Sequence, residues 1–212
     1  MSKEPKETPI DAEIKEAIYG AARNGDSELL KKLLDAYPAA VYVQDEKGYN
    51  PAHYAVRKNK PACLRIIAAV APETLSVQNN RGNTPAHLAA LGNNLDCLRI
   101  IIEAARETLS LQNNGGEMPA HFAARYNNVA CLRIIIEVSS ETLSVQNKWG
   151  DTPAHLAALE NNPTCLQIII AAAPQALKIK NKDGETPLDT ARKYKSIACI
   201  ELIEESKNEQ DN

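Results

Sequence analysis

Four histidines recur at a fixed interval of 34 residues and are the first candidates for chemistry: His53, His87, His121 and His155. Imidazole is a common metal ligand and a common acid or base near neutral pH. A metal ion or a reaction needs these groups at one point, whereas a constant interval places each histidine in a different repeat. We therefore interpret the histidines as structural groups that bond neighbouring loops, because a buried polar side chain needs a partner.

No other segment has the pattern of a reactive site. The sequence contains no glycine-rich phosphate loop, no Ser-His-Asp order and no pair of carboxylates suited to acid–base catalysis. We predict a non-enzymatic protein with no catalytic residue, no cofactor and no metal ion.

The five cysteines follow the same interval, one to each repeat: Cys63, Cys97, Cys131, Cys165 and Cys199. Packed helices lie about 8 to 10 Å apart, whereas a disulfide needs Cα atoms within about 7 Å. Equivalent cysteines in successive repeats therefore cannot pair or share one zinc ion. We expect buried, reduced and unlinked thiols, which suit a cytoplasmic protein.

The elements that position these residues are clearest from Thr152 onward. Thr152 and Pro153 favour the start of a short helix, since the hydroxyl can accept a bond from a free amide and proline suits the first helical position. Asparagine then stops the helix, because it tolerates the left-handed conformation of a C-terminal cap. These stops are Asn59, Asn93, Asn127 and Asn161.

A second helix begins at Asn162 and Pro163 and has an apolar stripe that includes Cys165, Leu166 and Ile169. One repeat cannot bury this stripe alone, so the repeats must stack. An extended segment is expected from Pro174 to Asn181, followed by a turn at Gly184. The sequence predicts an all-α solenoid of stacked helix-turn-helix units joined by short hairpin loops.

The predicted organisation has three parts: a disordered segment at 1–10, a repeat domain at 11–205 and a polar tail at 206–212. The units of the domain are about 11–47, 48–81, 82–115, 116–149, 150–183 and 184–205. The first and last units are expected to cap the stack with polar surfaces. The near identity of the interior units is compatible with recent duplication or with consensus engineering.

The pattern Gly-x-Thr-Pro-x-His followed by Ala-Ala, as in GDTPAHLAA from Gly150, resembles the ankyrin repeat over about residues 14–203. The tetratricopeptide repeat has the same period, but its Trp, Gly and Tyr signature is missing. The resemblance implies that each histidine bonds with the preceding threonine. Asn50 and Met118 replace that threonine in two units. Ankyrin units usually have about 33 residues, and we expect the extra residue in a longer loop after the second helix.

Composition limits the partners. Basic and acidic residues, 24 and 27 in number, are mixed along the chain and give a net charge of −3. This balance favours neither nucleic acid nor an anionic membrane. No apolar run is long enough to span a bilayer, and the first residues lack the apolar core of a signal peptide. We expect a monomer that binds a protein.

Three arginines occupy equivalent positions in successive second helices: Arg65, Arg99 and Arg133. They could bind anions. Because Glu103 and Glu137 follow Arg99 and Arg133 by one helical turn, we instead expect ordinary surface ion pairs.

The repeats differ most at the hairpin tips and at the ends of the first helices, and the ankyrin resemblance implies that these positions line a concave, protein-binding face. Trp, Tyr and Arg dominate the energy of many protein interfaces. We select Trp149, Tyr126, Arg125 and Leu159 as the centre of a binding site. The outer members are Leu91, Arg81, Tyr49 and Arg57. The alternative interpretation of Trp149 is that it only covers the neighbouring loop.

The leading functional prediction is a binding module for one folded protein partner, acting as adaptor, scaffold or inhibitor. A second hypothesis is an enzyme with a site at the C-terminal cap, around Asp189, Arg192 and Tyr194. A third is a bacterial effector delivered to the cytosol of a host cell, because the acidic C-terminal end from Glu201 is similar to export signals of such effectors. A polar chain end explains the same residues.

Overall fold

The computed structural model describes the backbone of residues 10–210 and the side chains of residues 10–206. The regular structure in this range is helical and consists of α1 to α12 and the short 3-10 helices η1 to η5. Each unit contributes one pair of α-helices. The pairs are α1 (Ala12–Asn24) with α2 (Ser27–Ala36), α3 (Pro51–Arg57) with α4 (Pro61–Val70), α5 (Pro85–Gly92) with α6 (Leu95–Ala105), α7 (Pro119–Arg125) with α8 (Val129–Ser139), α9 (Pro153–Leu159) with α10 (Pro163–Ala172) and α11 (Pro187–Tyr194) with α12 (Ile197–Gln210).

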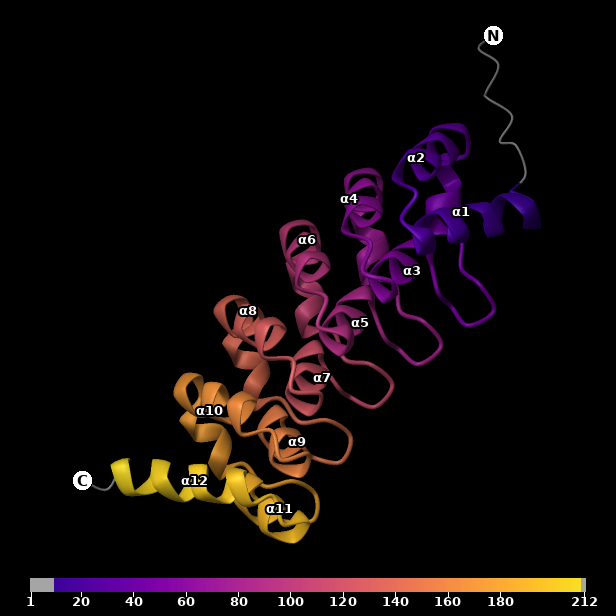
Figure 1. Cartoon of the computed structure of the whole chain (residues 1–212). Coiled ribbons are helices and arrows are strands. Elements are labelled where there is room, and N and C mark those ends of the chain that lie inside the picture. The colour runs from indigo at the N-terminus through magenta and orange to yellow at the C-terminus, as the bar shows by residue number, and fades with distance from the viewer. Residues whose placement is uncertain (1–9, 211–212) are drawn as a thin grey trace.

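The pairs stack side by side into a solenoid (Figure 1). The first helices of the units form one layer, in which α3 packs on α5, α5 on α7 and α7 on α9. The second helices form the other layer. The hairpin loops all project on the side of the first helices, as Figure 1 shows. The predicted all-α solenoid is confirmed.

Local sequence sets the ends of the first helices. Proline occupies the first position of α3, α5, α7, α9 and α11, where its missing N–H costs nothing. The predicted left-handed stops are confirmed, since Asn59, Asn93, Asn127 and Asn161 have φ angles from 50° to 54°. In the outer units, Gly25 and Lys195 take this conformation.

A second asparagine follows the stops at Asn93, Asn127 and Asn161, and its side chain bonds to the preceding repeat. The Nδ2 group of Asn94 donates to the carbonyl of Val56 at 2.7 Å. This carbonyl lies at the end of a first helix and has no partner within that helix. Asn128 and Asn162 make equivalent bonds to Ala90, Leu91, Ala124 and Arg125. The side chains predicted to start second helices therefore also join successive repeats.

The apolar stripes of the second helices are buried between units. In α8, Cys131, Leu132 and Ile135 have no exposed surface. The Sγ atom of Cys131 lies 3.8 Å from the carbonyl oxygen of Ala89 in the preceding repeat. All five cysteines are buried and free, as predicted. Burial raises the pKa of Cys97 and Cys131 to about 12, which leaves little reactive thiolate at neutral pH.

The segment after each second helix differs from the prediction of an extended chain or a longer loop. After α2, α4, α6, α8 and α10 it begins as a 3-10 helix and is extended only beyond it, as at Ile179. These helices are η1 (Pro38–Tyr42), η2 (Pro72–Ser76), η3 (Arg106–Ser110), η4 (Ser140–Ser144) and η5 (Pro174–Lys178). In η4 the hydroxyl of Thr142 donates to the carbonyl of Ser139 at 2.7 Å. This turn brings Leu143 back into the core, where it has no exposed surface.

The two ends also differ from the predicted boundaries. Helix α12 continues to Gln210, so that residues 206–210 of the predicted tail are helical. Ile10 was placed in the disordered segment, but it packs against the core. The rest of that predicted segment, 1–9, lies outside the described residues. Within the described range, none of the helices is both long enough and apolar enough to cross a membrane.

We predict that the thiols of the native protein react slowly with a thiol reagent, because all five are buried. Unfolding in denaturant should expose five reactive thiols. A spectrophotometric thiol titration of the native and unfolded protein measures both. Fast labelling of several sites in the native protein would contradict the buried arrangement.

Replacing Leu132 by alanine should lower the free energy of unfolding by about 2 to 5 kcal/mol, since it removes a fully buried side chain from the centre of the stack. Arg133→Ala is the matched control, because Arg133 is the next residue on α8 and is exposed. It should change stability by less than about 0.5 kcal/mol. Urea unfolding of both variants checks the assignment, and equal costs would show that the stripe is misplaced.

Candidate functional site

Each hairpin tip is held by its own side chains and by the next hairpin. In the tip that carries Trp149, Oδ1 of Asn147 accepts the N–H groups of Trp149 and Asp151, both at 2.9 Å. Gly150 turns the chain with φ at 82°, and an added Cβ would lie 2.5 Å from the backbone nitrogen of Lys182. That nitrogen donates to the carbonyl of Trp149 at 3.0 Å. The tips therefore form a backbone-bonded row.

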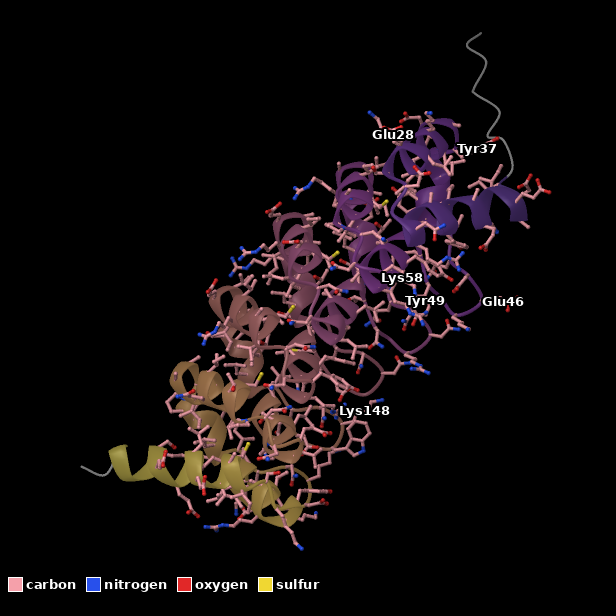
Figure 2. The ribbon with its side chains drawn as sticks, in the orientation of Figure 1. Glu28, Tyr37, Glu46, Tyr49, Lys58 and Lys148 are labelled. Carbon is pink, nitrogen blue, oxygen red and sulfur yellow. The ribbon has the colours of Figure 1, made fainter. Side chains whose placement is uncertain are left out.

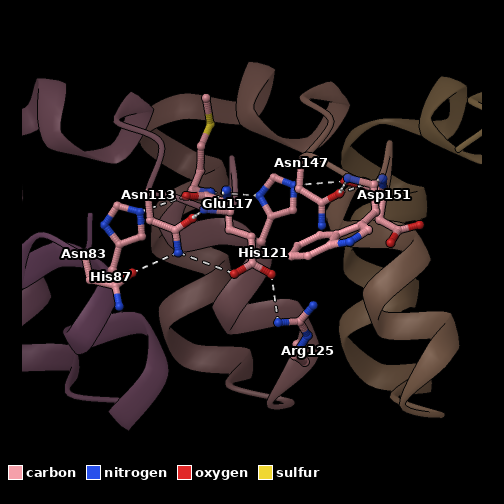
Figure 3. Close-up of polar contacts among 11 residues, drawn as sticks. Asn83, His87, Asn113, Glu117, His121, Arg125, Asn147 and Asp151 are labelled. Atoms are coloured by element: carbon pink, nitrogen blue, oxygen red, sulfur yellow. Dashed lines mark hydrogen bonds and ion pairs between the residues drawn. The ribbon is translucent and has the colours of Figure 1, made fainter. Parts of the chain in front are cut away.

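His87 shows what the histidines do (Figure 3). Its Nδ1 atom accepts the N–H of Thr84 at 3.1 Å, and its Nε2 atom donates to the carbonyl of Glu117 in the next hairpin at 2.9 Å. The other histidines reach the next hairpin in the same way, at Asn83, Asp151 and Glu185. The interpretation of these residues as structural bonds between loops is confirmed.

Burial lowers the pKa of His87 and of His121 to about 4. The bond from Thr84 acts in the same direction on the pKa of His87, because a proton on Nδ1 would face the N–H of Thr84, whereas the bond from Nε2 to the carbonyl of Glu117 opposes the lowering. Asn50 and Met118 replace the threonine in two units, yet their N–H groups also donate to Nδ1 of His53 and His121. The junction between hairpin and first helix is therefore the same in these units.

Two of the three residues considered for an enzymatic site, Asp189 and Arg192, have partners within the fold. Oδ2 of Asp189 accepts the N–H and the hydroxyl of Thr186 at 2.9 and 2.7 Å and so caps α11. Arg192 forms an ion pair with Glu204 of α12 at 2.7 Å. In residues 10–206, the His, Cys, Asp and Glu side chains form no group of three that could hold a metal ion.

Exposed apolar side chains gather on the hairpin side. Leu91, Tyr126, Trp149 and Tyr194 are exposed, with 58% of Trp149 and 52% of Tyr126 accessible to solvent. They lie at hairpin tips or at the ends of first helices, whereas the other large exposed apolar residues are dispersed: Leu29, Tyr42, Val70 and Ile197. Trp149 also lies over the neighbouring loop, since a Cβ added to Gly115 would be 3.5 Å from its ring. It covers that loop and still exposes more than half of its surface.

Several predicted site residues already have partners. Arg125 forms an ion pair with Glu117 at 2.8 Å, and only 24% of its side chain is exposed (Figure 3). The half-buried ring of Tyr49 packs against His53, and the guanidinium of Arg57 lies 5.8 Å from its centre. Figure 2 shows Tyr49 on the hairpin side together with Glu46 and Lys148. The remaining predicted members differ in exposure: Arg81 and Leu91 are exposed and Leu159 is half-buried.

A pocket of about 220 Å³ lies between α9 and α11 on this face. Its lining brings together Trp149 and Leu159, which the sequence predicts for the binding site, with Tyr194, which the sequence indicated only for an enzymatic site. Thr190 and Lys193 also line it and were not predicted. Thr190 stands where the preceding repeats have Leu88, Phe122 and Leu156. This change from a large apolar residue to a small polar one is the feature of the sequence that could have indicated a pocket.

The ion pairing of the arginines on the second helices differs from the predicted pairing within one helix. Glu103 lies 3.6 Å from Arg65 of the preceding repeat instead of pairing with Arg99. Both side chains are about two-thirds exposed, at 68% and 66%. Stacking brings α4 and α6 close enough for this contact, which at such exposure adds little stability.

Lowering the pH from 7 to 5 should destabilise the protein by about 2 kcal/mol for each of His87 and His121. The unfolded histidine takes up a proton near pH 6.5, whereas the folded one stays neutral until about pH 4. Stability is therefore present above pH 6.5 and is lost as the pH falls toward 4. Urea unfolding at both pH values measures the loss. His87→Gln should lose less between pH 7 and 5 than the parent, and an identical loss would rule out His87 as a source.

Comparisons with known proteins agree with this geometry. A family model described as ankyrin repeats in three copies matches residues 18–110, 71–143, 105–176 and 120–211. No sequence among the curated proteins matches the chain.

Solved structures of similar fold include an ankyrin repeat domain from Acinetobacter baumannii AYE, with a TM-score of 0.78, 22% identity and coverage of 90% of this chain and 97% of that one. The ankyrin repeat domain of Bcl-3, a member of the IkappaB family, has a TM-score of 0.81, 17% identity and coverage of 90% and 85%. A chain in the complex of the predatory endopeptidase Bd0816 from Bdellovibrio bacteriovorus with the immunity protein Bd3460 has a TM-score of 0.76, 23% identity and coverage of 89% and 97%. At these identities the structures share the fold alone. The family model extends over residues 18–211, and the chain therefore belongs to the ankyrin repeat family.

Proposed function

We propose that the chain is a non-enzymatic binding module that docks one folded protein on its hairpin side, as an adaptor, scaffold or inhibitor. The observation that carries the proposal is the set of exposed apolar side chains on this side: Leu91, Tyr126, Trp149 and Tyr194. Aromatic residues of this kind dominate the energy of many interfaces. Exposed apolar side chains gathered on one side are typical of interaction sites.

The rigidity of the scaffold supports the same role. The carbonyl of Trp149 is bonded to the next hairpin, and Asn147 holds the N–H groups of the tip. A surface fixed before binding loses less conformational entropy when the partner arrives. Side chains can therefore differ from unit to unit while the backbone beneath them stays the same.

The family supports a protein partner, because ankyrin repeats are in general protein–protein interaction modules. One structural neighbour is a chain of a complex between an endopeptidase and an immunity protein. We propose that this chain acts as a monomer and without catalysis. A reducing, cytoplasmic compartment fits its five buried free thiols.

Truncating Trp149 or Tyr126 to alanine should weaken partner binding by at least about 2 kcal/mol and leave thermal stability nearly unchanged, because both side chains are more than half exposed. Arg133→Ala, on the opposite layer of helices, should change neither. The partner is first obtained by affinity purification with the parent protein and with the Trp149→Ala, Tyr126→Ala double variant. Calorimetry with the purified partner then measures each single variant.

Two results would contradict the proposal. Equal losses from Arg133→Ala and Trp149→Ala would place the interface on the second helices or on both layers. Unfolding of Trp149→Ala at room temperature would show that the tryptophan is needed to cover the loop at Gly115.

A further inference from the structure

In several repeats a hairpin residue interacts with the residue eight positions later, at the end of the first helix. In unit 116–149 these residues are Glu117 and Arg125, which form an ion pair at 2.8 Å. In unit 184–205 they are Glu185 and Lys193, which form an ion pair at 2.7 Å. In the first of the hairpins, Tyr49 has the guanidinium of Arg57 over its ring at 5.8 Å. A cation from the first helix is thus the neighbour of the hairpin residue in these repeats, and in unit 82–115 an uncharged hairpin residue, Asn83, is followed by Leu91.

Unit 150–183 has the acid without the cation. Asp151 occupies the position of Glu117 and Glu185, but Leu159 stands where Arg125 and Lys193 stand. In the described part of the chain, Asp151 has no ion pair, and its side chain accepts only the amide of Asn181 at 2.9 Å. Both Asp151 and Leu159 line the pocket between α9 and α11. The pocket therefore lies at the place where a cation is missing.

The walls of this pocket also suit a cation. Trp149 and Tyr194 line it and are both more than half exposed, at 58% and 55%. Aromatic faces attract cations, and arginine more often than lysine. The ammonium of Lys193 already lies 5.8 Å from the centre of the Tyr194 ring while it bonds to Glu185. A cation from this chain is therefore already held beside an acid and an aromatic ring of the lining.

A buried polar atom adds an unused hydrogen-bonding group. The side chain of Thr190 lines the pocket, is only 4% exposed, and its hydroxyl has no hydrogen-bond partner. A buried hydroxyl without a partner is costly. Its oxygen has almost no accessible surface, so a ligand in the pocket reaches it only when the side chain rotates. The half-buried Leu159 provides apolar surface for the methylene groups of a long side chain.

We propose that this pocket receives the side chain of an arginine of the partner protein, with its guanidinium against Asp151 and between Trp149 and Tyr194. Arginine fits better than lysine because a planar guanidinium can stack on an aromatic ring while it donates to a carboxylate. The proposal rests on the proposed function, since it names the chemistry of the partner at one place on the same surface. Lys193 is then a competing cation of the pocket.

The test uses the whole chain and a small probe, N-acetyl-arginine methylamide, titrated to about 50 mM at pH 7 and followed by proton–nitrogen NMR. Trp149 is the only tryptophan, so its indole N–H signal is identified without assignment. Single side chains bind with dissociation constants on the order of 1 to 10 mM. We expect a saturable shift of the indole signal with this probe. The neutral analogue N-acetyl-citrulline methylamide should shift it at least about fivefold less.

Charge variants separate the cation from other ligands. Asp151→Asn keeps the shape of the side chain and should weaken binding of the arginine probe at least about fivefold. Asp96→Asn makes the same change at an exposed position on α6 and should leave binding unchanged. Lys193→Gln should tighten binding, because it removes the competing cation. No shift with the arginine probe, an equal shift with citrulline, or weaker binding in Lys193→Gln would each overturn the proposal.

The experiments distinguish a failure of the arginine pocket from a failure of the proposed function. If the partner is lost by the Trp149 and Tyr126 variants while the arginine probe causes no shift, the binding face stands and the arginine pocket is wrong. If the probe binds but those variants keep the partner, the pocket binds a guanidinium, and both the docking face and the assignment of the pocket to that partner are wrong.

Discussion

Each repeat has an apolar stripe on its second helix that only a neighbouring repeat can bury, and the rest of the structure depends on this constraint. Stacking buries Leu132 and Ile135 completely and brings polar groups of successive repeats within bonding distance. Asn128 then satisfies carbonyls at the end of α5, and His121 bonds the hairpin of the next unit. Apolar burial supplies the attraction, whereas these bonds fix the register, because a buried donor without an acceptor is expensive.

The sequence predicted well what is decided within one repeat. The left-handed stop at Asn161, the helix start at Pro153 and the burial of Cys165 each follow from the chemistry of one residue at a repeated position. Contacts that stacking creates were less accessible. The pairing of Glu103 with Arg65 in the preceding unit depends on the offset between neighbouring helices, which no periodicity within one helix encodes. The 3-10 turns were also missed, because Leu143 returns to a core that exists only after stacking.

The predicted members of the candidate surface differ in whether their side chains are free in the structure. Trp149 and Tyr126 are exposed at the predicted positions, but Arg125 is held by Glu117. Arginine is frequent in interfaces, which favoured Arg125 as a site residue. Whether its guanidinium is free to bind a partner depends on Glu117, eight residues earlier. The same relation, applied to Asp151 and Leu159, shows an acid without its cation. Comparing paired positions between repeats is therefore more informative here than ranking single residue types.

Near-identical repeats can form a specific surface because the bonds that hold the stack recur in each repeat, while the exposed side chains differ between repeats. The bonds that join the hairpins include backbone pairs, such as the carbonyl of Trp149 with the N–H of Lys182, and bonds from side chains that recur along the stack, such as Asn114 to the carbonyl of Asn80. Among the described residues, the side chain of Trp149 takes no part in these bonds, and exposed substitutions usually change stability by less than about 0.5 kcal/mol. Replacement of a large apolar residue by Thr190 and of a cation by Leu159 can therefore open a pocket in one unit without loosening the stack. Specificity then arises where one repeat departs from its neighbours.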